Sequence, residues 1–299
     1  MTAVVGAPVS PRPIGGAAAV PAPDAAARRG ADPAPGPLLA MTFPHAGGHP
    51  AGPGLRALWA DRLAAGATPL PHACAGPGRS FAEMTSALLD RMPGGAAAGL
   101  VVLAHITPDL DPRDSVAGAL AAPGRLVFAV SDQGRLAPFT ALRVAAAFPD
   151  RDPAVVIALD QARVPYADPD LSALDARADH AVALRPDLGF GPVRQWAGIP
   201  GDRLDDVLAA ALAAERPDLV VLGPALPPPT ERHWRRAPAD RLGTAVFDEL
   251  AAELDRPDPA RRITVVEYEP ATAGLALVSF ARRTPGPEPH LQPDPPHHR

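Results

Sequence analysis

The sequence predicts an α/β protein in which helices cover both faces of a sheet. Short apolar runs alternate with stretches whose apolar residues recur at helical spacing. Runs such as GLVVLAH (99–105) and AVVIAL (154–159) lack polar alternation, which is typical of strands buried on both faces. The same rhythm occurs twice along the chain, which suggests an internal duplication of the α/β unit.

The first half begins with an expected strand over residues 38–43. A helix over 81–91 is indicated by Ser80, which is followed three residues later by Glu83 in capping-box spacing. A helix over 138–148 begins at Pro138, where a proline is tolerated because the first helical N–H has no partner. The other expected elements of this half are a helix over 55–64 and strands over 99–105, 126–131 and 154–159.

The second half repeats this order in outline. Expected strands cover 180–184, 219–222, 263–268 and 275–281, and expected helices cover 204–216 and 242–254. Both ends are rich in Pro, which supplies 41 of the 299 residues, so we expect tails without a core. The predicted organisation is a disordered tail (1–36), two α/β halves (37–170 and 171–283) and a second disordered tail (284–299).

Composition excludes several classes of function. The net charge of −5 and the absence of a basic stripe argue against a nucleic-acid partner. No apolar run reaches the roughly 18 residues that a membrane span needs. A single Cys fits a reducing cytoplasm. The chain contains no Lys, which excludes a Schiff base or a phosphate-loop lysine from this chain. We expect no cofactor.

Two short motifs suggest chemistry that their surroundings do not support. His45 and His49 have the i, i+4 spacing of a helical metal pair, but the glycines between them favour a loop, so we expect no metal. FPHAGG (43–48) resembles the oxyanion loop of type II thioesterases, although the chain has no G-x-S-x-G nucleophile turn. Cys74 lies in a Gly/Pro loop, which favours an incidental thiol over a nucleophile.

Longer segments resemble the thiolase-fold ketosynthases, especially the type III ketoacyl synthases. The resemblance rests on the order of the segments along residues 37–283, and it implies a thiolase-like duplicated α/β/α/β/α fold. The similar segments are LAHITPD (103–109), LVFAVSDQGRLAPFTALRVAAA (126–147), AVVIALD (154–160), ADHAVALRPD (178–187), DDVLAAALAAERPDLVVLGPAL (205–226) and RITVVEYEPATAGLALVSFARR (262–283).

Carried over to this chain, the family's catalytic Cys, His and Asn are all missing. The position of the nucleophile falls on Arg135, and a shift of a few residues reaches Gly134, Gln133 or Asp132, but never a Cys. Gly223, followed by Pro224, stands where the family's His is expected, and the chain contains no Asn. Self-acylation of Arg135 is excluded because its guanidinium stays protonated.

Two interpretations of Arg135 remain open. In the first, it fills the former acyl pocket and pairs with a carboxylate such as Asp132. In the second, Arg135, Asp132 and Gln133 form a ligand site, in which the guanidinium and the start of a helix attract an anionic group. His105, at a strand end, and His233, in a polar loop, are candidate acid–base residues.

The resemblance implies three functional hypotheses. The first is a Cys-less partner subunit in polyketide or fatty-acyl assembly, with a homodimer or a heterodimer with a catalytic ketosynthase, and with an acyl carrier protein or acyl-CoA as further partners. The second is a divergent acyltransferase or decarboxylase that forms no covalent acyl-Cys. The third, from the FPHAGG loop, is a degenerate thioesterase-like α/β-hydrolase.

Overall fold

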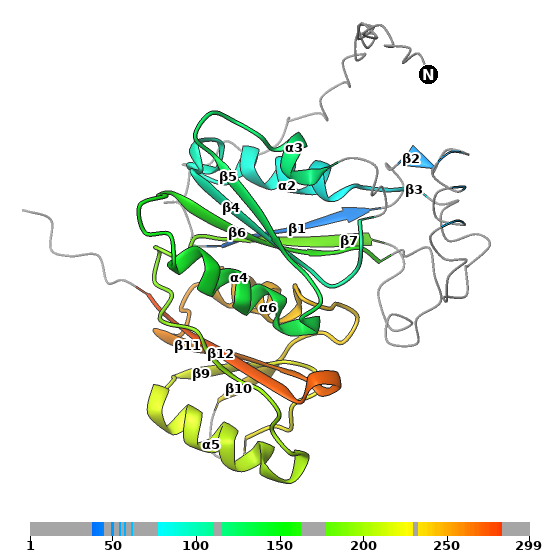
Figure 1. Ribbon diagram of the computed structural model, residues 1–299. Coiled ribbons are helices and arrows are strands. Elements are labelled where there is room, and N and C mark those ends of the chain that lie inside the picture. The colour runs from blue at the N-terminus through cyan, green and yellow to red at the C-terminus, as the bar shows by residue number, and fades with distance from the viewer. Residues whose placement is uncertain are drawn as a thin grey trace, which may run out of the picture. The chain divides into compact units, whose positions relative to one another are not determined.

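Two five-stranded sheets form the framework of the structure, a computed structural model (Figure 1). It describes residues 38–44, 49–50, 54, 57, 61, 77–109, 115–162, 178–229 and 233–282, all within one compact unit of the chain. Both expected tails, His45, Cys74 and most of the expected helix over 55–64 lie outside the described residues. His49 lies in the short strand β2 (His49–Pro50), which pairs with β3 (Pro77–Gly78).

The first sheet has the strand order β1-β7-β6-β4-β5. The central strand β4 runs parallel to β5 and β6, whereas β7 runs antiparallel to β6 and β1. The bounds are β1 Leu38–Pro44, β4 Leu100–His105, β5 Leu126–Val130, β6 Ala154–Asp160 and β7 Ala178–Leu184.

The second sheet, β10-β9-β11-β12-β8, repeats this arrangement. Here β9 runs parallel to β10 and β11, and β12 runs antiparallel to β11 and β8. The topology therefore contains the expected duplication, and it excludes the single sheet that a thioesterase-like hydrolase needs. The bounds are β8 Arg194–Trp196, β9 Leu219–Leu222, β10 Trp234–Arg236, β11 Arg262–Glu269 and β12 Gly274–Ala281.

Strand β7 belongs to the first sheet, although its sequence was expected to begin the second half. It pairs along its length with β1 and with β6. The sheets therefore divide the chain between Leu184 and Arg194, later than the boundary expected after residue 170. Local sequence gives no information on which sheet an apolar strand joins, because that choice depends on partners distant in the chain.

Helices and short helical turns accompany the sheets in the described part of the chain. Helix α2 begins at the predicted capping box, in which Ser80 Oγ accepts from Glu83 N and the Glu83 carboxylate accepts from Ser80 N. The helices are α2 Phe81–Arg91, α3 Val116–Ala119, α4 Ala137–Ala146, α5 Leu204–Glu215 and α6 Ala245–Leu254. The 3₁₀ turns are η3 Gly95–Ala97, η4 Gly134–Leu136, η6 Gly201–Arg203 and η7 Pro270–Thr272.

Side-chain alternation along the strands builds five layers (Figure 1). Leu100 and Val102 of β4 face a central cluster that contains α4, α6 and the inner face of the second sheet. Val101 and Leu103 face α2 on the other side of the first sheet. In the second sheet, Val221 of β9 faces the central cluster, while Val220 and Leu222 face α5. Period-two alternation thus decides which layer each side chain enters.

Candidate functional site

The carboxyl ends of the parallel strands lie where α4 and α6 begin. In the first sheet, β4, β5 and β6 all end at one edge, and in the second sheet β9 and β11 do the same. Loops beyond the carboxyl ends of parallel strands commonly carry ligand-binding and catalytic groups. The residues predicted from sequence, His233 excepted, fall at these ends.

The turn between β5 and α4 holds Asp132, Gln133 and Arg135. Asp132 has a φ of 59°, a left-handed conformation that is uncommon for a residue with a side chain. Asp132 and Gln133 are exposed, and Gln133 Oε1 accepts from Thr140 Oγ1 at 2.9 Å. Strained backbone of this kind occurs often at functional sites, so the turn is a candidate for chemistry.

Arg135 bonds to the protein itself. Its backbone N donates to Glu269 Oε2 at 2.8 Å, and its Nη1 donates to the carbonyl oxygens of Arg241 and Leu242 at 2.9 and 3.4 Å. Among the described residues, no ion pair joins Arg135 to Asp132, which instead accepts from Ser131 Oγ. The suggested Arg135–Asp132 pair is therefore wrong, because the guanidinium points toward the start of α6.

Glu267 fills the space beside Gly223. A Cβ atom at position 223 would overlap the Glu267 carboxyl, so only glycine fits while Glu267 holds this position. Burial raises the pKa of Glu267 from 4.5 to about 8, against the opposing effects of Arg135 and of the Tyr268 N–H. Glu267 Oε2 has no hydrogen-bond partner among the described residues. At neutral pH this group is mostly a protonated acid.

Asp160, at the end of β6, caps the start of α6. Its carboxylate accepts from the backbone N–H groups of Leu242, Gly243 and Thr244, each at 2.9 Å, and from the Thr244 hydroxyl at 2.6 Å. Asp160 is almost wholly buried. These bonds hold residues 242–244 ahead of the helix. The helix α6 therefore begins at Ala245 and not at Leu242, where the apolar pattern predicts its start.

Each half supplies a carboxylate that binds the start of a helix or helical turn in the other half. Asp160 of the first half binds the start of α6 in the second half, and Glu269 of the second half binds the start of η4, ahead of α4. Gly134 is required here, since its φ is 52° and a Cβ would overlap Glu269. The helix start that was expected to attract an anionic ligand is thus occupied by the protein's own carboxylate.

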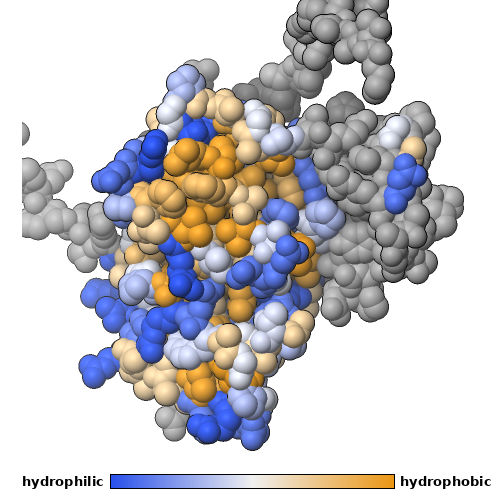
Figure 2. Space-filling model, in the orientation of Figure 1, coloured by the Kyte–Doolittle hydropathy of each residue, from blue (hydrophilic) through white to orange (hydrophobic). Residues whose placement is uncertain are grey.

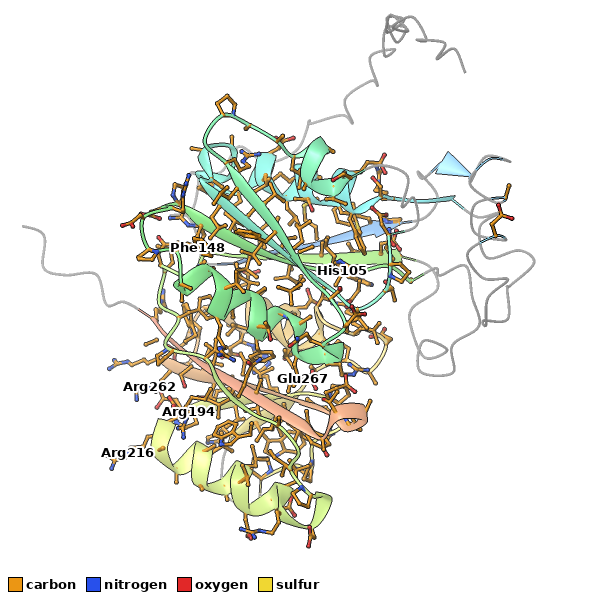
Figure 3. All side chains as sticks on the ribbon, viewed as in Figure 1. His105, Phe148, Arg194, Arg216, Arg262 and Glu267 are labelled. Atoms are coloured by element: carbon orange, nitrogen blue, oxygen red, sulfur yellow. The ribbon has the colours of Figure 1, made fainter. Side chains whose placement is uncertain are left out.

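His105 lies in a different layer from Arg135 and Glu267. It follows Val101 and Leu103 on the α2 side of the first sheet, whereas Glu267 follows Ile263 and Val265 on the central side of the second. The His105 and Phe81 ring centroids are 4.9 Å apart. Figure 3 labels His105 and Glu267 on the two sheets, with the central helices between them. The predicted site residues therefore form two groups.

His233 does not reach either group. It is exposed, and its carbonyl accepts from Val220 N. Since Trp234 pairs with Val220 in parallel, His233 lies at the amino end of β9, opposite to Gly223. It therefore lies far from the ends that carry the candidate chemistry.

Sequence reasoning missed the three buried or bridging carboxylates, Asp160, Glu267 and Glu269. Asp160 and Glu269 end the strands AVVIALD and RITVVEYE, and Glu267 lies two residues before the end of the second. An acidic residue that continues the inward-facing parity of a buried strand was the available signal, because such a side chain needs partners inside the fold. The partners of Asp160 and Glu269, in the opposite half, had no signal in the sequence.

Comparison with known proteins finds similarity in structure alone. No protein-family model matches the chain, and no curated protein matches it. A variant of OleA from Xanthomonas campestris bound with cerulenin has a TM-score of 0.51 at 13% identity, covering 82% of this chain and 95% of that chain. A second OleA variant with cerulenin has a TM-score of 0.50 with the same identity and coverage.

The 3-oxoacyl-(acyl carrier protein) synthase III of Pseudomonas aeruginosa PAO1 is also similar, with a TM-score of 0.45 at 16% identity, covering 70% of this chain and 85% of that chain. The likeness to the OleA structures confirms the predicted thiolase-like α/β fold. No helix in the part of the chain that the structure describes is long and apolar enough to cross a membrane.

Proposed function

We propose that this chain is a ketosynthase-like subunit of acyl-chain assembly that supports a condensation site without being acylated itself. The observation that carries the proposal is the Glu267 carboxyl beside Gly223, at the position where the resemblance implies a catalytic His. In this proposal, a buried acid that is mostly protonated lies beside the position that the resemblance gives to the side chain acting on a thioester. The structural likeness to OleA supports the class of chemistry.

The turn before α4 supports the same proposal. The residues from Ser131 to Thr140 contain no Cys. The Arg135 guanidinium lies next to the start of α6, where it donates to the Arg241 and Leu242 carbonyl oxygens. Arg135 and Glu267 thus each place a side chain of the protein beside a helix start or strand end of this region. Side chains held by the protein's own groups at these positions favour a partner that shapes an assembly over a subunit that forms an acyl intermediate.

The edge strand β5 offers a surface for a second subunit. Phe128 is 38% exposed on this strand, and its ring lies 5.4 Å from that of Phe148. Figure 2 shows hydrophobic residues gathered over β5 on this face. A mainly apolar groove of about 380 Å³ lies between α4 and the segment that joins β7 to β8, and it is lined by Leu142, Ala146, Phe190 and Val193 among others. Within the described part of the chain β5 is an edge strand, and an apolar edge favours pairing with another chain, so we propose a dimer through β5.

The test is co-expression with a ketosynthase encoded beside this chain, followed by sizing and intact-protein mass spectrometry. We expect a complex, product formation that depends on both chains, and no acyl adduct on this chain after incubation with acetyl-CoA. Cys74→Ala is the matched control, because Cys74 is the only thiol in the chain. A stoichiometric adduct on the wild type that maps between Ser131 and Thr140 would refute the proposal.

A further inference from the structure

The groove between α4 and residues 186–193 lies beside the point where the chain leaves the second sheet. The wall of the groove at Phe190 is attached to the end of β12, because the Phe190 and Phe280 ring centroids are 5.4 Å apart. Ala281 N also donates to the Gly189 carbonyl oxygen at 2.9 Å. Figure 1 shows the end of β12 and the end of α4 on the same side of the molecule. The chain after β12 therefore starts next to the groove.

The lining of the groove combines apolar side chains with one cation. Among the described residues that line it, Arg143 is the only charged one, and it is exposed. Its Nη1 donates to Gln195 Oε1 at 2.6 Å, and within the described part of the chain Arg143 forms no ion pair. The groove therefore suits an occupant that brings an apolar side chain and a carboxylate. The apolar lining includes Leu142, Ala146, Phe190, Pro192 and Val193.

The sequence after β12 contains both of these groups. Residues 283–299 read RTPGPEPHLQPDPPHHR, with six prolines and one large apolar side chain, Leu291. Proline-rich sequences favour the polyproline II conformation, which has three residues per turn, so that every third side chain lies on one face. Glu288 and Asp294 stand three residues before and three residues after Leu291. In that conformation one face presents a Leu side chain between two carboxylates.

We propose that residues 288–294 bind in this groove of the same chain, with Leu291 against Phe190 and the Asp294 carboxylate paired with Arg143. A segment without a core of its own can remove its Leu side chain from water only against another surface. Aromatic-lined grooves are a usual binding surface for extended proline-rich segments. The inference does not depend on the proposed function.

The direction of β12 decides which carboxylate meets Arg143. Residues 189–191 run antiparallel to the end of β12, so β12 ends on the side of the groove wall that is farther from β8. Gln195 of β8 holds the Arg143 guanidinium on the β8 side. The dipeptide Pro285–Gly286 favours a turn that sends the chain back along the groove. A chain with this course meets Arg143 last, so the acid after the Leu forms the ion pair.

The chain is long enough for this course. Leu291 follows Arg282 by nine residues, which span up to about 28 Å in the polyproline II conformation. Along α4 the groove extends from Leu142 to Ala147, about 8 Å at the helical rise. A short tether sets an effective concentration in the millimolar range. Contacts too weak to hold a separate peptide can therefore hold this segment.

Disulfide trapping in the full-length chain tests the contact. Cys74→Ala removes the only native thiol, and the pair Gln292→Cys/Ala147→Cys then reports whether the segment reaches the groove. Ala147 is exposed directly after α4. Under mild oxidation at low protein concentration, intact mass should show an intramolecular disulfide at least about tenfold faster than in the control pair Gln292→Cys/Ala213→Cys.

Ala213 is a matched control because it is exposed on α5, whose end also lies close to β12. Arg262 pairs with Ala281 of β12 and donates to the Glu215 carbonyl oxygen at the end of α5 at 3.0 Å. A segment without a preferred site would therefore reach either helix.

Two further sets of variants test the two contacts. Leu291→Ser should slow trapping at Ala147 about tenfold, because it removes the apolar side chain. Arg143→Glu should slow trapping by about two- to fivefold, the range of an exposed ion pair. Adding Asp294→Arg to Arg143→Glu should restore the rate, whereas adding Glu288→Arg should not.

Three results would overturn the inference. They are equal trapping of the Ala147 and Ala213 pairs, a rate that Leu291→Ser leaves unchanged, and equal restoration by the two charge reversals. A disulfide-linked dimer in place of the intramolecular product would assign the groove to the segment of a second copy, and would also overturn it.

Discussion

Glu267 occupies the volume that any side chain at Gly223 would need. The two residues come from neighbouring parallel strands, since Val266 pairs with Leu222 and the next residues follow on both strands. The Glu267 carboxyl therefore packs directly against the backbone of Gly223 at the carboxyl ends of β9 and β11. A larger residue at position 223 would therefore force the Glu267 carboxyl to move.

Gly223→Ala should destabilise the fold by about 1–3 kcal/mol, because the added methyl group must displace a buried carboxyl. Urea unfolding measures the effect. Gly201→Ala is the matched control, since nothing lies within 4 Å of a Cβ there. The double variant Gly223→Ala/Glu267→Ala should recover part of the loss, and strict additivity of the two changes would contradict the shared volume.

Stability should fall as pH rises toward 8. The folded state holds the Glu267 proton more tightly than the unfolded chain, because burial raises its pKa to about 8. This contribution to the free energy of unfolding is complete below about pH 4.5 and is lost as pH rises through 8. Glu267→Gln stays neutral at every pH. Its free energy of unfolding, measured relative to the wild type, should therefore increase between pH 5 and pH 8.5.

Urea unfolding at pH 5 and at pH 8.5 provides the measurement. Glu249→Gln on α6 is the control, because it removes a carboxylate that forms an ion pair with Arg235. If Glu267→Gln and the wild type lose stability in parallel over this range, Glu267 does not carry the raised pKa.

Asp160→Asn should destabilise the protein by about 3 kcal/mol, because a buried carboxylate that accepts four hydrogen bonds would be replaced by an amide that faces N–H donors. Asp258→Asn, on the surface after α6, should lie within experimental error of the wild type. Hydrogen exchange should show faster opening at Leu242 and Thr244 in Asp160→Asn, and protection equal to the wild type at those amides would count against the cap.

Arg135→Cys alone should not produce a self-acylating chain. The chain has no Asn to assist a thiol at 135, Gly223 stands where the resemblance implies a His, and residues of a catalytic unit are strongly non-additive. Intact mass after incubation with acetyl-CoA measures the outcome, with Arg143→Cys on α4 as the control for a newly introduced thiol. An adduct specific to Arg135→Cys would mean that the remaining groups still activate a nucleophile.

Phe128→Lys should weaken self-association, because it places a charge on the apolar edge strand β5. Sedimentation across a range of concentrations measures the dissociation constant, which we expect to rise at least about tenfold, or about 1.4 kcal/mol. Trp234→Lys is the control, since Trp234 is 40% exposed on β10, the edge strand of the second sheet. An equal effect of both variants would argue against β5 as the interface.

Much of the fold could be predicted from the sequence because its signals are local. Unbroken apolar runs indicated β4, β6, β7 and β9, and a capping box fixed the start of α2 at Ser80. Strands β8 and β10 were missed because each has three residues, among them exposed or half-buried arginines, which is too short for a period to be visible.

The sequence by itself determined the α/β class, the repeat of the unit and the absence of Cys from the segment between β5 and α4. Only the tertiary structure decided that Asp160 binds the start of α6, that Glu267 fills the space at Gly223 and that His105 packs against Phe81 of α2. The physical reason is that an apolar period depends on near neighbours, whereas the role of a polar side chain depends on partners brought together by folding. Asp160 and Thr244 stand 84 residues apart, and no local pattern joins them.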